Sequence, residues 1–146
     1  MRLCPRHLRL YGRSAPERTM VDVDGRGIPV TAHSDPAHID WAAYGADLVI
    51  EATGRFRTRD DAARHLKGGA RRVLVSAPGR SVDVTIVPGV NDAAYDPRRH
   101  QIVSMASCTT NCVAPMVKHE NVGVVRGFMT TVHAYRCVEM AARMAE

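Results

Sequence analysis

The sequence predicts an α/β fold with a mostly parallel sheet. Two patterns point to it: apolar segments of strand length alternate with a segment of helical spacing, and the connections are short and rich in glycine and proline. A third observation is that 45% of the 146 residues are hydrophobic, which is enough for one ordinary core. No internal repeat or low-complexity tract interrupts this order.

A β-hairpin and a buried strand are the first elements expected after the N-terminal region. Apolar residues flank the turn-forming run 24–27 (DGRG), so residues 20–32 predict a short hairpin. Residues 33–41 form a connector. Residues 46–52 are apolar at successive positions, which predicts a parallel strand covered by helices on both faces. This strand ends at Thr53-Gly54.

A short helix follows. Thr58 is expected to cap it, two aspartates lie in its first turn, and Gly68-Gly69 end it. Brief strands are expected at 73–76, 84–87 and 102–104, helical spacing at 108–118, and a last strand at 127–135.

The formal net charge of +5 is concentrated at the N-terminus. Residues 1–20 hold five arginines and one glutamate, a balance of +4, which leaves 15 basic and 14 acidic side chains in residues 21–146. A charge balance of +1 gives the body no field that would attract a polyanion, so no nucleic-acid partner is expected. Nor is a membrane span, because no apolar run approaches about 18 residues.

The four cysteines, Cys4, Cys108, Cys112 and Cys137, include no CxxC pair. We therefore expect reduced thiols and a cytoplasmic location. Residues 1–18 are rich in arginine and nearly free of acidic residues. Such a composition is compatible with an organelle transit peptide, a misplaced start or a remnant of upstream sequence.

The strongest local signal is the run 106–112 (ASCTTNC), a small, hydroxyl-rich turn between a strand and a helix. It places Cys108 at the helix start, where unpaired N–H groups and the positive end of the helix dipole favour a thiolate. Thr109, Thr110 and nearby N–H groups could stabilise an oxyanion. From the residues alone, a buried structural cysteine is the commoner alternative.

Cys112 lies one turn beyond Cys108 on the same helix face. Two sulfurs need further metal ligands, and none occurs nearby at a recognisable spacing, so no metal site is expected. Cys112 is instead expected to be a core residue behind the reactive thiol, or one that oxidises with it. His133, near the end of the last expected strand, is either a structural histidine or the base that an activated cysteine requires.

Thr53-Gly54 and Ser76 end neighbouring strands, so they are expected at the carboxyl edge of the sheet, where α/β proteins bind ligands. Phe56 could form a wall for an adenine ring. The sequence has no GxGxxG motif, so these residues alone do not establish dinucleotide binding. The remaining histidines are expected to be solvated or to form local hydrogen bonds: His7, His33, His38, His65, His100 and His119.

Taken together, these segments resemble the phosphorylating glyceraldehyde-3-phosphate dehydrogenases. The matching runs occur in the family's order: 35–41 (DPAHIDW), 48–54 (LVIEATG), 75–78 (VSAP), 106–115 (ASCTTNCVAP) and 129–135 (MTTVHAY). The last two are highly specific, and they make Cys108 and His133 strong catalytic candidates.

The resemblance implies an incomplete Rossmann-like, mostly parallel sheet with the beginning of a catalytic α+β domain. The implied division is an Arg-rich leader at 1–19 that matches the family weakly, a partial NAD-binding domain at 20–106, and the start of the catalytic domain at 107–146. The family forms homo-oligomers, so the resemblance implies a homo-oligomer.

The implied reaction is the NAD-dependent oxidation and phosphorylation of glyceraldehyde 3-phosphate to 1,3-bisphosphoglycerate in glycolysis. Cys108 would form a thioester, His133 would act as the base, and inorganic phosphate would release the product. By the same match, Ser107 and Thr109 would bind substrate and phosphate. Three further residues would line the NAD site: Thr53, Gly54 and Ser76.

The sequence also departs from the family pattern. The family's first βαβ unit, with its run Asn-Gly-Phe-Gly-Arg-Ile-Gly, has no counterpart beyond a weak match at 10–13. After Tyr135 the family continues Thr-Asn-Asp-Gln, whereas this chain has 136–139 (RCVE) and ends at Glu146. The family also has two more residues between Lys118 and His119.

These departures predict weak NAD binding and impaired activity in a partial chain that lacks the glycine loop and most of the catalytic domain. The alternative is a non-catalytic fragment or a module that binds partners or oligomers. A small thiol enzyme that works without NAD is a third reading.

Overall fold

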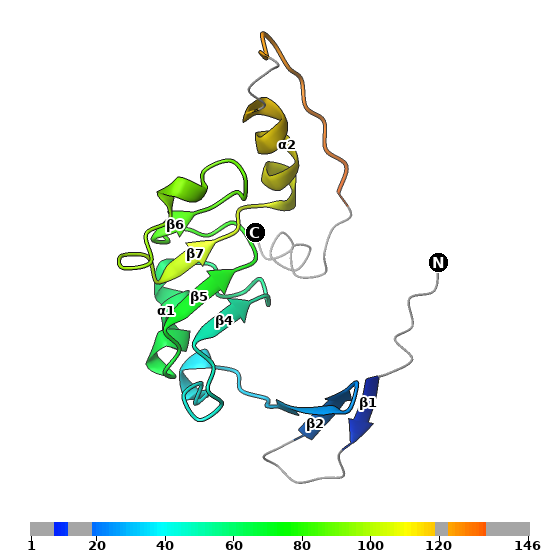
Figure 1. The fold of residues 1–146 in the computed structure, drawn as a ribbon, viewed down its shortest axis with the longest axis vertical. Helices are drawn as coiled ribbons and strands as arrows, with labels where there is room; N and C mark the ends of the chain where they lie inside the picture. The colour runs from blue at the N-terminus through cyan, green and yellow to red at the C-terminus, as the bar shows by residue number, and fades with distance from the viewer. Residues whose placement is uncertain (1–7, 12–18, 119–122, 134–146) are drawn as a thin grey trace, which may run out of the picture.

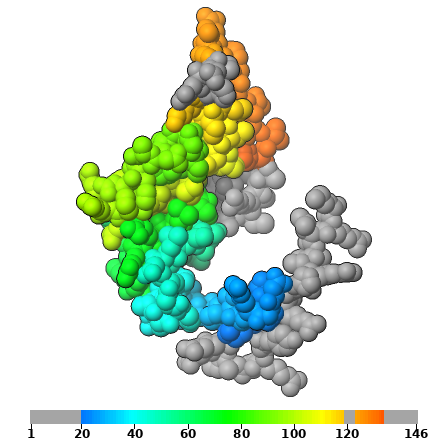
Figure 2. Space-filling view, in the orientation of Figure 1, coloured from blue at the N-terminus to red at the C-terminus, as the bar shows by residue number. Residues whose placement is uncertain are grey.

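The computed structural model describes residues 8–11, 19–118 and 123–133, which contain two separate sheets (Figure 1). One is a three-stranded antiparallel sheet near the N-terminus. The other is a four-stranded parallel sheet flanked by a helix. In the space-filling view the residues coloured blue adjoin those coloured cyan and stand apart from those coloured green (Figure 2). Among the described residues, no helix combines the length and apolar character needed to cross a membrane.

The antiparallel sheet confirms the predicted hairpin and adds a strand to it. Strand β2 (Thr19–Val23) pairs with β3 (Arg26–Val30) through a two-residue turn in which Asp24 and Gly25 have φ of 52° and 79°. Two successive positive φ angles match the twist of the flanking strands. Strand β1 (Leu8–Tyr11) pairs with the other edge of β2 and was not predicted.

The parallel sheet confirms the predicted fold class. Its strands are β4 (Leu48–Glu51), β5 (Arg72–Val75), β6 (Val84–Thr85) and β7 (Ile102–Ser104), in the order β4-β5-β7-β6, and all neighbours are parallel. Strand β6 is shorter than the predicted 84–87 because the Val87 N–H donates to the Asn91 side chain, at 2.8 Å, instead of to a strand.

Helix α1 (Arg59–Lys67) connects β4 to β5 and packs against the parallel sheet to form the hydrophobic core. Thr58 caps it as predicted, because its hydroxyl oxygen accepts the Asp61 N–H at 3.2 Å. Ala62 is fully buried and packs with Val73, Val75 and Ile102 on one face of the sheet. The helix ends at Gly68, where a Cβ atom would lie 2.1 Å from the Ile39 carbonyl oxygen, so only glycine allows this close approach.

The opposite face of β4 is open, so the prediction of a strand covered on both faces is wrong for the part of the chain that the structure describes. Leu48 and Ile50 are 56% and 62% exposed, whereas Val49 and Glu51 are buried. Helix α1 covers only the face to which the latter two point. An apolar hollow of about 490 Å³ lies on the open face, lined in part by Leu48, Leu74, Val103, Met105 and Tyr95.

The remaining elements are two 3₁₀ turns, η1 (Pro36–His38) and η2 (Asp92–Ala94), and helix α2 (Cys108–Lys118). Helix α2 agrees with the prediction. The strand predicted at 127–135 does not form over residues 127–133, and 134–135 lie outside the described residues. A strand needs a neighbour to satisfy its N–H and C=O groups, and no described strand lies beside this segment.

Candidate active site

The turn between β7 and α2 is built around the buried hydroxyl of Ser104. This hydroxyl donates to the Ala77 carbonyl oxygen at 2.8 Å and accepts the N–H groups of Gly79 at 3.0 Å and Ala106 at 3.1 Å. Ala106 has a φ of 58°, a conformation that costs most side-chain-bearing residues energy. The turn therefore leads the chain directly from the sheet into Ser107 and Cys108.

Ser107 caps helix α2. Its hydroxyl oxygen accepts the Thr110 N–H at 3.0 Å and lies 2.7 Å from the Thr110 hydroxyl. Asn111 secures the same end, since its side-chain amide donates to the carbonyl oxygens of Met105 at 2.7 Å and Ser107 at 2.9 Å. The first turn of α2, which carries Cys108, is therefore anchored to the end of β7.

Both described cysteines are exposed. The reading of Cys108 as a buried structural residue is therefore wrong, and so is the expectation that Cys112 lies in the core. The reason is the position of α2, which has no buried residue. Cys108 stands at the helix start with its thiol accessible to solvent.

Thr109 joins Cys108 to His133. Its hydroxyl oxygen lies 3.9 Å from the Cys108 sulfur and 3.4 Å from Nε2 of His133, which is exposed. Two predicted catalytic residues 25 positions apart in sequence thus contact one side chain. Between the thiol and the imidazole themselves the structure records no hydrogen bond in the described residues.

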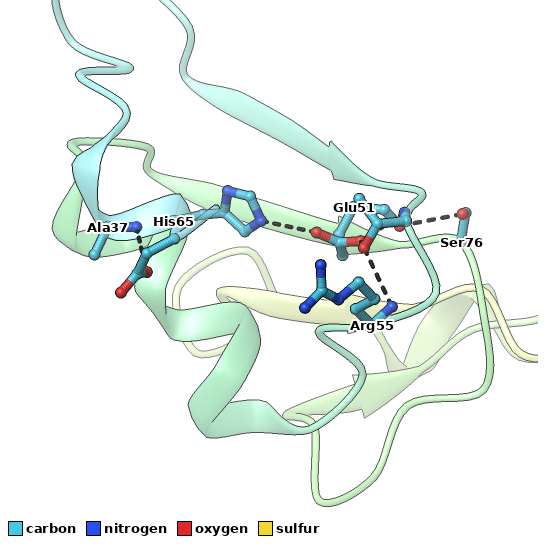
Figure 3. Close-up of polar contacts among 7 residues, drawn as sticks. Ala37, Glu51, Arg55, His65 and Ser76 are labelled. Atoms are coloured by element: carbon cyan, nitrogen blue, oxygen red, sulfur yellow. Dashed lines mark hydrogen bonds and ion pairs between the residues drawn. The ribbon is translucent and has the colours of Figure 1, made fainter. Parts of the chain in front are cut away.

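Thr53 and Ser76 both contact Glu51 at the end of β4. Figure 3 shows Ser76 beside Glu51. The Glu51 carboxylate accepts the Thr53 N–H at 2.7 Å and the Thr53 hydroxyl at 2.5 Å. The Glu51 carbonyl oxygen accepts the Ser76 N–H at 3.0 Å and the Ser76 hydroxyl at 3.1 Å. Gly54 follows with a φ of 74°, and nothing lies within 4 Å of a Cβ built there.

The candidate site residues therefore follow the carboxyl ends of three parallel strands. Thr53, Ser76 and Cys108 come after β4, β5 and β7 respectively. Carboxyl ends of neighbouring parallel strands lie at one edge of a sheet, where open α/β folds bind ligands. No group of three or more potential metal-ligating side chains occurs within residues 8–11, 19–118 and 123–133.

Comparison with known proteins identifies the family. Residues 6–59 match the glyceraldehyde 3-phosphate dehydrogenase NAD binding domain, and residues 107–143 match the C-terminal domain of the same enzyme. Over 115 residues the chain is 54% identical to glyceraldehyde-3-phosphate dehydrogenase of Geobacillus stearothermophilus, and over 117 residues 55% identical to that of Streptomyces coelicolor. This chain belongs to the glyceraldehyde-3-phosphate dehydrogenase family. It spans about a third of these relatives' length, 34% and 35%.

The matched ranges include most of the candidate site residues, and Ser76 lies between the two ranges. The match to the dehydrogenase C-terminal domain includes Cys108 and His133, and the match to its NAD binding domain includes Thr53 and Gly54. A third relative, glyceraldehyde-3-phosphate dehydrogenase 1 of Bacillus cereus, is 49% identical over 124 residues, which are 84% of this chain and 37% of the relative.

Three residues of the candidate site were not predicted from the sequence: Glu51, His65 and Asn111. His65 was expected to be solvated or bonded locally, but it is 5% exposed and its Nε2 lies 3.0 Å from the Glu51 carboxylate. Phe56 packs edge-on against the His65 ring, with 6.3 Å between ring centres. A charged residue in an otherwise apolar strand, at Glu51, was the available signal, because buried carboxylates are paired or hydrogen-bonded.

Proposed function

We propose that this chain carries the cysteine chemistry of an NAD-dependent, phosphorylating oxidation of glyceraldehyde 3-phosphate to 1,3-bisphosphoglycerate, a step of glycolysis. The observation that supports it best is the contact of both Cys108 and His133 with the Thr109 hydroxyl at the exposed start of α2. The activity is a property of the whole dehydrogenase, of which this chain spans about a third.

In this proposal the Cys108 thiolate attacks the aldehyde carbon. A C–S bond forms and the carbonyl pair moves to oxygen, where the N–H groups at the start of α2 stabilise the charge until the oxygen is protonated. His133 then accepts the hydroxyl proton of this adduct as the hydride leaves the carbon. The thioester that results on Cys108 is attacked by inorganic phosphate, so the C–S bond breaks, the acyl phosphate departs and the thiolate returns.

NAD is the proposed cofactor, and it supplies the acceptor for the hydride. Thr53, Gly54 and Ser76 are the proposed cofactor-binding residues, because they follow neighbouring parallel strands at one sheet edge. The open space around Gly54 fits a close approach of the cofactor to the backbone.

Ser107 and Thr109 are the proposed substrate- and phosphate-binding residues. Ser107 already caps α2, so we propose that its role toward an anion is to hold the helix N–H groups in place rather than to act by its hydroxyl alone. Thr109 would hold the substrate oxygen beside Cys108. The proposal includes a division of the chain into a leader at 1–19, a partial NAD-binding domain at 20–106 and a catalytic segment at 107–146. It also includes a cytoplasmic location and a homo-oligomeric assembly.

A second candidate is a non-catalytic module that associates with other dehydrogenase subunits. The exposed Leu48 and Ile50 on the open face of the parallel sheet favour it, because apolar side chains on a sheet face are usually covered.

The test measures NAD reduction by the purified chain with glyceraldehyde 3-phosphate and phosphate. Cys108→Ser removes the proposed nucleophile, and Cys112→Ser is the matched control, since both cysteines are exposed on the same helix. We expect weak turnover that Cys108→Ser abolishes and Cys112→Ser retains. A folded chain without turnover would refute catalysis by this chain alone and favour the module.

A further inference from the structure

The Glu51 carboxylate is buried between the end of β4 and helix α1, and polar groups meet both of its oxygens. Glu51 is 3% exposed. One oxygen accepts the N–H and hydroxyl of Thr53, and the other lies 3.0 Å from Nε2 of His65. Figure 3 shows the carboxylate between the His65 ring and the turn that follows β4. A buried carboxylate is costly unless it is paired in this way.

His65 is held in place by aromatic packing. Its ring lies 5.7 Å from the Trp41 ring centre and 6.3 Å from that of Phe56. Its Nδ1 has no hydrogen-bond partner among the described residues, whereas Nε2 faces an acceptor. For this pair to form a hydrogen bond with the carboxylate as acceptor, Nε2 must carry the hydrogen.

The hydrogen bonds recorded at the turn after β4 run through the side chains of Glu51 and Thr53. The Thr53 hydroxyl donates to Glu51 and accepts the Arg55 N–H at 3.2 Å. Gly54 has no side chain to pack, and nothing lies within 4 Å of where one would begin. The backbone from Thr53 to Arg55 is therefore linked through Glu51 to His65 on helix α1.

We propose that Glu51 and His65 are positioning residues that fix the Thr53–Gly54 turn, so that the packing of helix α1 sets the shape of the cofactor edge. The consequence for cofactor binding rests on the proposed function, but the fixing of the turn does not. Ser76 belongs to the same unit, because its N–H and hydroxyl both donate to the Glu51 carbonyl oxygen.

Asp83 supplies a matched control for a purely structural carboxylate. Its side chain is 11% exposed, it accepts the backbone N–H groups of Gln101 and Ile102 at 2.8 and 2.9 Å, and it pairs with Arg59 at 2.8 Å. It therefore makes the same kinds of contact as Glu51, but its hydrogen bonds go to the start of β7 and to Arg59 and not to Thr53, Gly54 or Arg55. A variant of Asp83 should weaken the fold without loosening that turn.

The first test is hydrogen exchange of single amides by NMR in the full chain. His65→Leu removes the donor to Glu51, His65→Gln keeps a side-chain N–H that can replace it, and Asp83→Asn is the control. We expect Thr53 and Arg55 to exchange at least about tenfold faster in His65→Leu than in Asp83→Asn, and His65→Gln to restore most of the protection. Equal exchange in His65→Leu and Asp83→Asn would overturn the proposal.

A second measurement needs no variant and applies even if His65→Leu does not fold. Nitrogen-15 chemical shifts report which ring nitrogen of His65 carries a hydrogen. The proposal requires a hydrogen on Nε2, and a ring protonated on Nδ1 alone would contradict it.

An NAD titration of the same variants separates this inference from the proposed function. If the wild-type chain binds NAD, we expect the Kd to rise more in His65→Leu than in Asp83→Asn. Absence of NAD binding by the folded wild-type chain would overturn the cofactor role of this edge, while the exchange contrast would still decide whether Glu51 and His65 position the turn.

Discussion

The Thr109 hydroxyl lies 3.4 Å from Nε2 of His133, 24 residues along the chain. Because the same oxygen is 3.9 Å from the Cys108 sulfur, a single side chain connects the thiol with the imidazole. Hydroxyl groups both donate and accept, so Thr109 can link the two groups in either protonation state.

Replacing Thr109 should therefore change the reactivity of the Cys108 thiol. We expect Thr109→Val to slow alkylation of Cys108 by iodoacetamide at neutral pH by roughly 2- to 10-fold, the value of one ordinary hydrogen bond. Thr109→Ser keeps the hydroxyl and should react like the wild type. Labelling rates measured by mass spectrometry check this, and identical rates for the Val and Ser variants would contradict it.

Cys108 and Cys112 should differ in reactivity although both are exposed. Only Cys108 stands at the first residue of α2, with its sulfur 3.9 Å from the Thr109 hydroxyl, whereas Cys112 lies one turn further along the helix. Iodoacetamide should modify Cys108 well before Cys112, and before Cys4 and Cys137, which lie outside the described residues. Peptide mapping after short exposures gives the order, and equal labelling of all four would show that Cys108 is not activated.

The capping role of Ser107 predicts a stability difference. Ser107→Ala removes the acceptor of the Thr110 N–H and should lower the free energy of unfolding by about 1 kcal/mol. Ser107→Asp retains an acceptor and adds a favourable charge at the helix start, so its free energy of unfolding should fall much less. Urea denaturation of the two variants measures the contrast, which a merely solvated serine would not produce.

Asp83 should make stability depend on acid pH. Burial raises the pKa of Asp83, but hydrogen bonds from the Ile102 N–H, the Arg59 guanidinium and the Gln101 N–H outweigh it and hold the pKa below the ordinary 3.8. A carboxyl with a lowered folded-state pKa stabilises the fold above its unfolded pKa, and this contribution is lost as the pH falls through the folded value.

We therefore expect Asp83→Asn to lower the free energy of unfolding by about 1–3 kcal/mol at neutral pH. The difference in free energy of unfolding between the wild type and the variant should become smaller as the pH falls below 3.8. Urea unfolding of both proteins at neutral pH and at successive pH values below that point isolates Asp83, because every other group titrates in both. A gap that is independent of pH would show that the charge of Asp83 contributes nothing.

Two glycines should respond differently to alanine. At Gly68 a Cβ would lie 2.1 Å from the Ile39 carbonyl oxygen, so the chain must shift, and we expect a loss of about 1–3 kcal/mol. At Gly54 the space is open and only the φ of 74° opposes a side chain, which costs about 1 kcal/mol. Denaturation midpoints compare the two variants, and a larger loss at Gly54 would contradict the steric argument.

Local signals were sufficient to predict most of the fold. The hairpin, helix α1 and its cap at Thr58, and the parallel strands each carry turn residues, caps or apolar runs within a few positions of one another. The strand predicted at 127–135 failed because β propensity reports the residue and not the presence of a partner. The open face of β4 was missed for a similar reason, since apolar residues at Leu48 and Ile50 do not reveal what covers them.

The candidate site was predictable in part. Cys108 and His133 were singled out from local sequence and the family motif, and the structure links both to Thr109. The Glu51–His65 pair was not predicted, because it joins residues 14 positions apart through tertiary packing. A histidine within a helix gives no sequence signal of a buried acceptor on the neighbouring strand.

The open face of the parallel sheet should govern how the chain behaves in concentrated solution. Leu48 and Ile50 favour self-association there, whereas the net charge of +5 keeps molecules apart. Salt shortens the range of that repulsion from about 10 Å at 0.1 M to about 3 Å at 1 M and leaves apolar attraction intact. Light scattering should therefore detect larger particles as ionic strength rises, the opposite of a protein held together by ion pairs.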